Sequence, residues 1–232
     1  MKYYKIETKR FYENDMIATN AQGKKIENAD DYFWKMNRGE MIDDAPLIFD
    51  YFYLQSFDVE KYWEWLLTDV YRFIGEGSQI PGWLISKKLR NLLENFNIAE
   101  PHFYYASKLL YKGEKLDYYI FQFSGKIFRL PLTDYVDFTK SLFYDPNHKI
   151  DFKVDNEVDL LSKQEKIVEE SNFEVINIPI KKLVFNSNID FISMQNFLGD
   201  KLVSEKLKQA IEENGITGFE FSELDYEVII DN

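Results

Sequence analysis

One sequence pattern occurs twice in this chain of 232 residues. Residues 82–103 read GWLISKKLRNLLENFNIAEPHF, and residues 200–221 read DKLVSEKLKQAIEENGITGFEF, at a constant offset of 118. Over the aligned stretches 84–98 and 202–216, six of fifteen residues are identical. Because each copy predicts a helix followed by a strand, the pattern constrains the architecture of the whole chain. Two explanations stay open, a duplicated structural unit and the convergence of capped amphipathic helices.

Each copy has the start, the apolar face and the end of a short helix. Ser86 and Ser204 are placed as N-caps, with the hydroxyl accepting from an early backbone N–H. Asn97 and Gly215 stand where the helix ends, and both residue types tolerate the left-handed conformation of a helix terminator. The apolar residues recur at helical spacing and predict one buried stripe per helix, made of Leu89, Leu92, Leu93 and Phe96 in one copy and Leu207, Ala210 and Ile211 in the other.

The rest of the chain mixes strands and helices without regular alternation. Strands are expected over 2–6, 102–111, 173–185 and 226–230, a β-hairpin over 117–132 around Ser124–Gly125, and turns at 20–25 and 112–113. A helix is expected over 58–74 with Asp58 as its N-cap, and Pro179 indicates an edge strand or a bulge. Residues 145–174 predict loops with short strands and one short helix. This order favours a single α+β domain over 1–232, with antiparallel or mixed sheets, packed helices and pseudo-repeated halves 1–116 and 117–232.

The composition excludes several classes of protein. Lys and Arg number 28 against 40 Asp and Glu, and the net charge of −12 argues against a nucleic-acid partner, whose phosphates attract basic surfaces. Cysteine is absent, so disulfides and thiolate metal sites are excluded. The first residues lack the apolar stretch of a signal peptide, and no segment has enough consecutive apolar residues to span a membrane. We expect a cytoplasmic protein.

Residues with catalytic potential are few and scattered. His102 and His148 are the two histidines, and they lack the spacing of a metal site. Asp30–Asp31 and Asp43–Asp44 are adjacent carboxylate pairs that are expected on the surface. No catalytic, cofactor-binding or metal-binding residue is therefore predicted. A carboxylate-based hydrolase or metal-dependent enzyme stays open as an alternative.

The second copy of the pattern resembles the C-terminal signature of a bacterial immunity-protein family that accompanies polymorphic toxins and was formerly described as a domain of unknown function. That signature has a short "hd-F-r" segment followed by "l-V-S-e-x-L-k-x-a-l" and "G-i-x-G-f-x-F". Asp190–Phe191 stands at the short segment without its Arg, and the later part is matched by Val203, Ser204, Leu207, Ala210, Gly215, Gly218 and Phe221. Upstream, "VDFTKSLF" is similar to the family's "v-D-a-l-d-l-e-k-S". The resemblance runs discontinuously over about 83–221.

The resemblance implies a non-catalytic protein that binds a cognate toxin domain and neutralises it. The acidic charge suits a basic toxin, because opposite charge speeds encounter. Residues 30–69 hold ten acids against Lys35, Arg38 and Lys61, among many aromatic residues. We therefore predict the partner-binding surface within 41–64, at Asp43, Asp44, Asp50, Tyr53, Asp58 and Glu60. A scaffolding module of a secretion or regulatory assembly is the other alternative, and the oligomeric state stays open.

Overall fold

The computed structural model describes residues 1–12, 19–55, 66–123, 133–175, 178–194 and 200–231. The strands in these ranges are β1 (Tyr3–Thr8), β2 (Asn20–Gln22), β3 (Phe49–Gln55), β4 (Val70–Tyr71), β5 (Phe73–Ile74), β6 (Gly82–Ser86), β7 (His102–Tyr111), β8 (Glu114–Phe123), β9 (Leu142–Asp145), β10 (Ile150–Phe152), β11 (Ile180–Phe185), β12 (Phe191–Ser193), β13 (Lys201–Ser204), β14 (Phe219–Glu223) and β15 (Glu227–Ile230). The helices are α1 (Ala29–Asn37), α2 (Lys87–Leu93), α3 (Glu157–Glu170) and α4 (Glu205–Glu213), with 3-10 turns at Gly75–Gly77 and Thr133–Tyr135.

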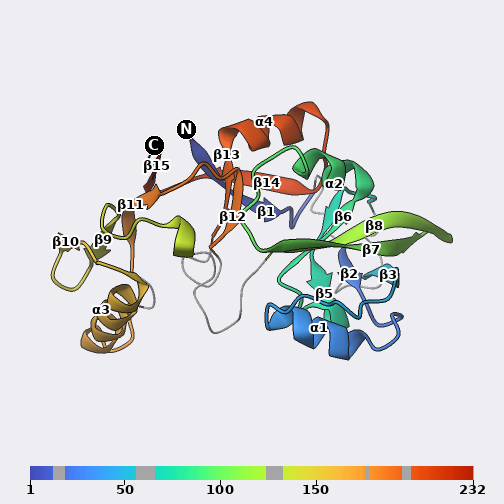
Figure 1. Cartoon of the computed structure of the whole chain (residues 1–232), viewed down its shortest axis with the longest axis horizontal. Coiled ribbons are helices and arrows are strands. Elements are labelled where there is room, and N and C mark those ends of the chain that lie inside the picture. Colours follow the sequence, from blue (N-terminus) through green and yellow to red (C-terminus); the bar gives the residue numbers. More distant parts are fainter. Residues whose placement is uncertain (13–18, 56–65, 124–132, 176–177, 195–199, 232) are drawn as a thin grey trace.

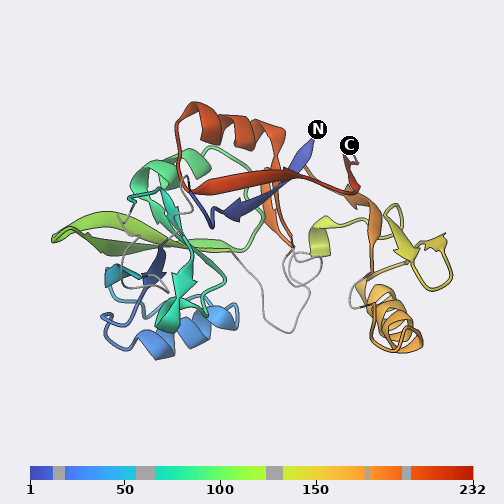
Figure 2. The same cartoon turned by 180° about the vertical axis from the view of Figure 1, so that it is seen from behind.

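The strands form three sheets, and Figures 1 and 2 show how they follow one another along the molecule. The large sheet has the order β4-β6-β8-β7-β3-β2-β5, the central sheet β12-β13-β1-β14, and the outer sheet β10-β9-β11-β15. Antiparallel pairs dominate, and parallel pairs occur at β2–β5, β3–β7 and β11–β15. Antiparallel and mixed sheets packed against helices confirm the predicted α+β fold.

Helix α1 covers one face of the large sheet. Its inward residues Phe33 and Met36 are fully buried against Phe49 and Phe52 of β3. The rings of Phe33 and Phe52 lie 6.0 Å apart between centroids, close enough for the pairwise attraction of aromatic rings. The opposite face of this sheet is covered by α2 near β6 and β8, as Figure 1 shows.

The two copies of the repeated pattern form one shared core. Leu89 and Leu93 of α2 lie in the same buried cluster as Leu207 and Ile211 of α4, together with Phe191 of β12. Each helix also reaches the end of the other. The Nζ atom of Lys88 donates to the carbonyl of Gly215 at 3.1 Å, and the Nζ atom of Lys206, the residue equivalent to Lys88, lies 5.0 Å from the ring centroid of Phe96.

The serine caps are confirmed in both copies. The backbone N–H of Leu89 donates to Ser86 Oγ at 3.1 Å, and that of Leu207 donates to Ser204 Oγ at 3.1 Å. Each serine ends the strand that precedes its helix, so one residue closes the strand and satisfies an N–H that the first helical turn leaves without a partner.

Each capping serine also donates to an aspartate that serves both copies. Ser86 Oγ donates to Asp69 Oδ1 at 2.6 Å, and Asp69 Oδ2 accepts from the backbone N–H of Thr217, beyond α4, at 2.9 Å. Reciprocally, Ser204 Oγ donates to Asp190 Oδ1 at 2.7 Å, and Asp190 Oδ2 accepts from the N–H of Asn97, beyond α2, at 3.0 Å. Each aspartate thus binds the capping serine of one copy and a backbone N–H that follows the helix of the other copy, so these hydrogen bonds join the two copies.

The two helices end differently, which corrects part of the prediction. Gly215 has φ of 57°, and the N–H groups of Gly215 and Ile216 donate to the carbonyls of Glu212 and Ile211, as in a Schellman motif. The prediction that Asn97 adopts the left-handed conformation is wrong. Helix α2 ends in successive turns at Asn95 and Phe96, and Asn97 instead makes the contact with Asp190.

The helix predicted over 58–74 is wrong in its described part. Residues 70–71 and 73–74 are strands β4 and β5, and Val70 and Tyr71 pair with Ile85 and Leu84 of β6. Pairing with a strand that lies later in the chain overrides the local helical pattern. The rest of the predicted helix, including its N-cap Asp58, lies outside the described residues. Residues 20–22, expected in a turn, form β2.

The predicted strand at 102–111 and turn at 112–113 are confirmed as the β7–β8 hairpin. Lys112 and Gly113 have φ of 49° and 87°, as a two-residue hairpin turn requires. The terminal strand is confirmed as β15, and the hairpin predicted around Ser124–Gly125 lies outside the described residues.

The outer sheet carries the longest helix of the described residues. Helix α3, of 14 residues, occupies the segment expected to hold only a short helix. The strand predicted over 173–185 begins only at Ile180, and it lies between β9 and β15, so it is not an edge strand. The other possibility that Pro179 indicated, a bulge, is present. The pairing of β11 with β9 shifts its register between Ile180 and Lys182. The division into halves at 116/117 falls within β8 and stays a prediction.

The aspartate–serine contacts predict unequal losses of stability in two matched variants. Ser204→Ala removes a helix cap and leaves Asp190, which is only 3% exposed, without its serine donor, so we expect the free energy of unfolding to fall by about 2–3 kcal/mol. Ser86→Ala is expected to cost about 1 kcal/mol, because water reaches the half-buried Asp69. Urea denaturation measures both, and equal losses would contradict the interpretation that the burial of Asp190 makes its serine contact the costlier one to lose.

Candidate functional site

The residues predicted to bind a partner lie in two places. Asp43 and Asp44 are exposed in the turn that follows α1. The Nζ atom of Lys35 lies 3.2 Å from Asp44 Oδ2, and the Tyr32 hydroxyl donates to the carbonyl of Asp44 at 3.4 Å. These two carboxylates therefore belong to the side of the large sheet that α1 covers.

Asp50 and Tyr53 lie on β3. Lys115 Nζ is 2.7 Å from Asp50 Oδ2 and 4.6 Å from the ring centroid of Tyr51. Partial burial raises the pKa of the Tyr53 hydroxyl. Phe52 and Leu54 are buried in the α1 core, and side chains alternate along a strand, so Tyr53 faces the side opposite to α1.

The four predicted residues that the structure describes thus do not form one surface. Asp43 and Asp44 are separated from Tyr53 by the thickness of the large sheet, and Asp58 and Glu60 lie outside the described residues. The sequence placed these residues in one segment, but the alternation along β3 divides the segment between two faces.

Tyr53 contributes to a pocket that combines residues of β3 with residues of distant segments. The pocket has a volume of about 320 Å³ and is lined by Lys25, Tyr51, Tyr53, Leu54, Leu110, Lys112 and Gly113. Tyr53 pairs with Leu110 through the parallel contact between β3 and β7. The pairing register that brings them together is not visible as a local pattern in the sequence, which is why Lys25, Leu110 and Lys112 were not predicted.

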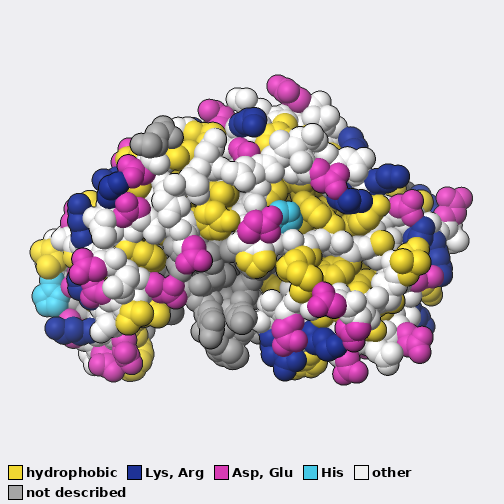
Figure 3. All heavy atoms as spheres, in the orientation of Figure 1, with side chains coloured by type: hydrophobic (Ala, Val, Ile, Leu, Met, Phe, Trp, Pro, Cys, Tyr) yellow, Lys and Arg dark blue, Asp and Glu magenta, His cyan; other side chains and the backbone are white. Residues whose placement is uncertain are grey.

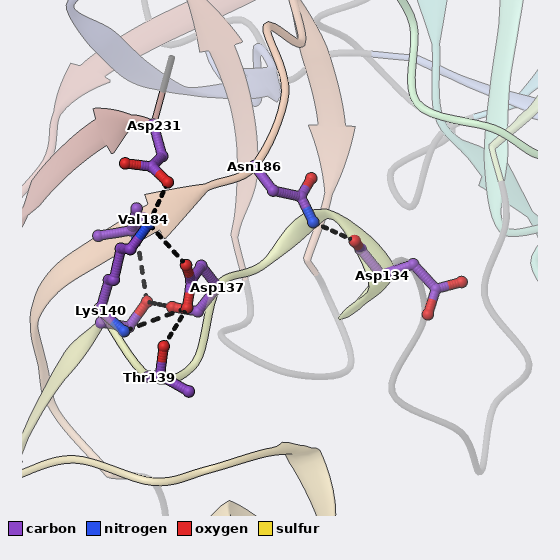
Figure 4. Close-up of polar contacts among 8 residues, drawn as sticks. Asp134, Asp137, Thr139, Lys140, Val184, Asn186 and Asp231 are labelled. Atoms are coloured by element: carbon purple, nitrogen blue, oxygen red, sulfur yellow. Dashed lines mark hydrogen bonds and ion pairs between the residues drawn. The ribbon is translucent and has the colours of Figure 1, made fainter.

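The segment "VDFTKS", which resembles an upstream family motif, forms a turn that attaches to β11 (Figure 4). Asp137 Oδ1 accepts from Thr139 Oγ1 at 2.7 Å and from the backbone N–H of Lys140 at 3.2 Å. Lys140 Nζ forms ion pairs with Asp137 and with Asp231, which follows β15. The hydrogen bonds from Thr139 and Lys140 lower the pKa of the Asp137 carboxyl, with the hydroxyl of Thr139 the largest cause.

Ser141 completes this turn from a fully buried position. Its hydroxyl donates to the carbonyl of Asp137 at 2.7 Å and accepts from the backbone N–H of Val184 at 3.0 Å. Beside it, the N–H of Asp137 donates to the carbonyl of Val184, and the Asn186 side-chain amide donates to the carbonyl of Asp134. The polar residues of the segment are thus used to join a loop to a strand.

The histidines lie apart from each other and from the pocket. His148 Nδ1 is 2.8 Å from Asp145 Oδ2, and Asp145 Oδ1 accepts from the N–H groups of Asn147 and His148. Burial opposes ionisation of Asp145, but these hydrogen bonds outweigh it, so its pKa lies below the ordinary value. His102 lies 3.4 Å from Glu100, which precedes β7. Within the described ranges, no group of three or more His, Asp or Glu side chains is arranged to hold a metal ion.

Comparisons with known proteins identify no family for this chain. No protein-family model matches the sequence, and no curated protein matches it.

Among the helices of the described residues, none has the length and apolar character needed to cross a membrane.

The contacts of Asp137 predict the pH dependence of stability. Its folded-state pKa lies below the ordinary value of 3.8, so its contribution is fully present above that value and is lost as the pH falls through the folded-state pKa. Between pH 7 and pH 3, we expect the free energy of unfolding to fall less in Asp137→Asn than in the wild type. Urea titrations at each pH measure this. The control Asp155→Asn removes an exposed carboxyl, and an equal effect of both variants would contradict the prediction.

Ser141→Ala tests the structural role of the same turn. The substitution leaves the buried N–H of Val184 without a partner, and we expect a loss of about 1–3 kcal/mol in the free energy of unfolding. Thr139→Ala is the exposed comparison within the turn, and its smaller loss is expected because water replaces the missing hydroxyl. A Ser141→Ala variant as stable as wild type would contradict this role.

Proposed function

We propose that the protein is an immunity protein that binds a cognate bacterial toxin domain and neutralises it without catalysis. The observation that carries the proposal is the structural use of the residues that resemble the immunity family. Ser204 caps α4 and donates to Asp190, and Leu207 is fully buried in the core shared by both copies. The positions of this chain that match the family signature are therefore the ones that cap and pack this part of the fold.

Gly218 also matches the family signature and also has a structural role. Its φ is 99°, and a Cβ atom at this position would lie 2.9 Å from Val70 Cγ1 and 3.0 Å from the carbonyl oxygen of Val70. Only glycine meets both requirements, since other residues rarely adopt this φ and would collide with β4. The glycine of the family-like "G-i-x-G" segment thus allows the second copy to approach β4, which pairs with β6 of the first copy, and this supports a common fold with the family.

The charge distribution supports a basic partner. Asp30 and Asp31 at the start of α1 are exposed, as are Asp43 and Asp44 in the turn behind it. With a net charge of −12, the molecule attracts a positively charged domain over a distance of about one Debye length, roughly 8 Å in physiological salt. Neutralisation then requires only that the bound protein covers the toxin's active surface.

The size of the molecule is ample for such a role. Its accessible surface is 12666 Å², and a stable interface takes about 800 Å² from each partner. Less than a tenth of the surface is therefore sufficient to occlude a toxin, and the rest is free to maintain the fold.

Growth rescue tests the proposal directly. Co-expression of this protein with the toxin domain encoded by the neighbouring gene is expected to restore growth, and the purified pair is expected to form a stable complex. Gly218→Val, which disturbs the contact with Val70, is the loss-of-fold control. Continued killing in the presence of soluble wild-type protein would refute neutralisation.

Electrostatic steering gives a second prediction. The triple variant Asp31→Asn, Asp43→Asn, Asp44→Asn is expected to slow association with the toxin domain severalfold at low salt, and the difference is expected to disappear at 0.5 M NaCl. Stopped-flow or surface plasmon resonance measures the association rate. The matched control changes three exposed acids at the opposite end of the molecule, Asp155→Asn, Glu165→Gln, Glu169→Gln. Equal slowing by both triples would exclude a role for the surface around α1.

A further inference from the structure

Among the described residues, α2 covers only part of the face of the large sheet opposite α1. Helix α2 packs its Leu89 and Leu93 over the end of the sheet formed by β6 and the second half of β8. Strand β3 and the outer ends of β7 and β8 extend beyond this helix, as the hairpin in Figure 1 shows. In the same orientation, Figure 3 shows hydrophobic side chains gathered over the β7–β8 ribbon. An incompletely covered sheet face of this kind is a common place for a partner.

The pocket at Tyr53 lies on β3 and the outer part of β7, beyond the part of this face that α2 covers. Tyr51, Tyr53 and Leu110 are each half-buried, so the pocket is open to the surface. Its volume of about 320 Å³ is at the lower end of the range for small-molecule sites, which enclose most of their ligand. An open apolar pocket of this size suits a side chain that protrudes from a bound protein, and such anchors supply much of the affinity at interfaces.

Two lysines at the rim give the pocket a chemical preference. Lys25 and Lys112 line it and are exposed, and neither forms an ion pair with a described carboxylate. Lys112 Nζ lies 5.3 Å from the ring centroid of Tyr111, and the positive-φ turn at Lys112 and Gly113 fixes its backbone. Lys115, by contrast, is engaged by Asp50. In a protein of net charge −12, these two ammonium groups place positive charge at the rim of the pocket.

We infer that this pocket receives an apolar or aromatic side chain of the bound toxin domain, flanked by carboxylates that pair with Lys25 and Lys112. The identity of the partner rests on the proposed function. The acidic surface around α1 attracts the basic partner as a whole, whereas the pocket recognises a segment of opposite character. Because the two surfaces lie on opposite faces of the large sheet, the acids around α1 act on the partner at long range, and the pocket acts at contact.

Binding of the toxin domain by pocket variants tests this inference. Tyr53→Ala and Leu110→Ala are each expected to weaken binding at least tenfold, as the loss of an anchor contact does. Lys25→Glu with Lys112→Glu is expected to weaken binding at least fivefold. The control Lys149→Glu with Lys153→Glu makes the same change in net charge near β10, at the opposite end of the molecule, and is expected to bind within twofold of wild type. Calorimetry measures affinity, and circular dichroism confirms folding.

The two proposals fail in different ways. If the wild type binds the toxin domain and the pocket variants bind equally well, the pocket inference is wrong and neutralisation stands. If the wild type does not bind the toxin domain, the proposed function is wrong, and a peptide assay tests the pocket by itself. Acetyl-Glu-Phe-Glu-amide is expected to shift the amide resonances of Leu110 and Gly113 saturably, and acetyl-Lys-Phe-Lys-amide is not. Equal shifts with both peptides, or none, would overturn the recognition chemistry.

Discussion

Two aspartates join the two copies of the repeated pattern. Asp190 is buried, and its two carboxylate oxygens accept from Ser204 in one copy of the repeat and from Asn97 in the other. Asp69 does the same with Ser86 and Thr217. A buried carboxylate is tolerated only when its hydrogen bonds are satisfied. For each aspartate, the donors come from both copies of the repeat. The central sheet, the large sheet and the core between α2 and α4 all depend on this junction.

The local parts of the repeat were predictable, and the contacts between its copies were not. Serine caps and apolar stripes lie within one helical turn or two, so their spacing reveals them. The aspartates lie 17 residues before Ser86 and 14 before Ser204, so a constant offset misses their equivalence. Helix α1 was also missed. It begins after Asn28, which has φ of 55° and provides no side-chain cap, and its buried Phe33 and Met36 stand among exposed charged residues.

For the candidate site, the sequence indicated which residue types are present but not which face of the large sheet each side chain lies on. The acids and aromatic residues of 41–64 are adjacent in the chain, yet β3 directs Tyr53 and Phe52 to opposite sides of the large sheet. The pocket at Tyr53 combines β3, β7 and the segment after β2, and only the strand order brings them together. The family-like "VDFTKS" segment supplies a turn that is attached to β11, and the two copies of the repeat pack against each other, so both motifs describe packing. A surface that binds a partner leaves a weaker periodic signal than a core does.

The position of β1 in the central sheet has a consequence for synthesis of the protein. This first strand is paired on both sides with strands from the last part of the chain, β13 and β14. At ribosomal rates of about 5–20 residues per second, its partners emerge on the order of ten seconds or more after it does. Strand β1, with its apolar Tyr3 and Ile6, therefore has neither of its native neighbours when it is synthesised, and the central sheet closes only after residues 201–223 have been added.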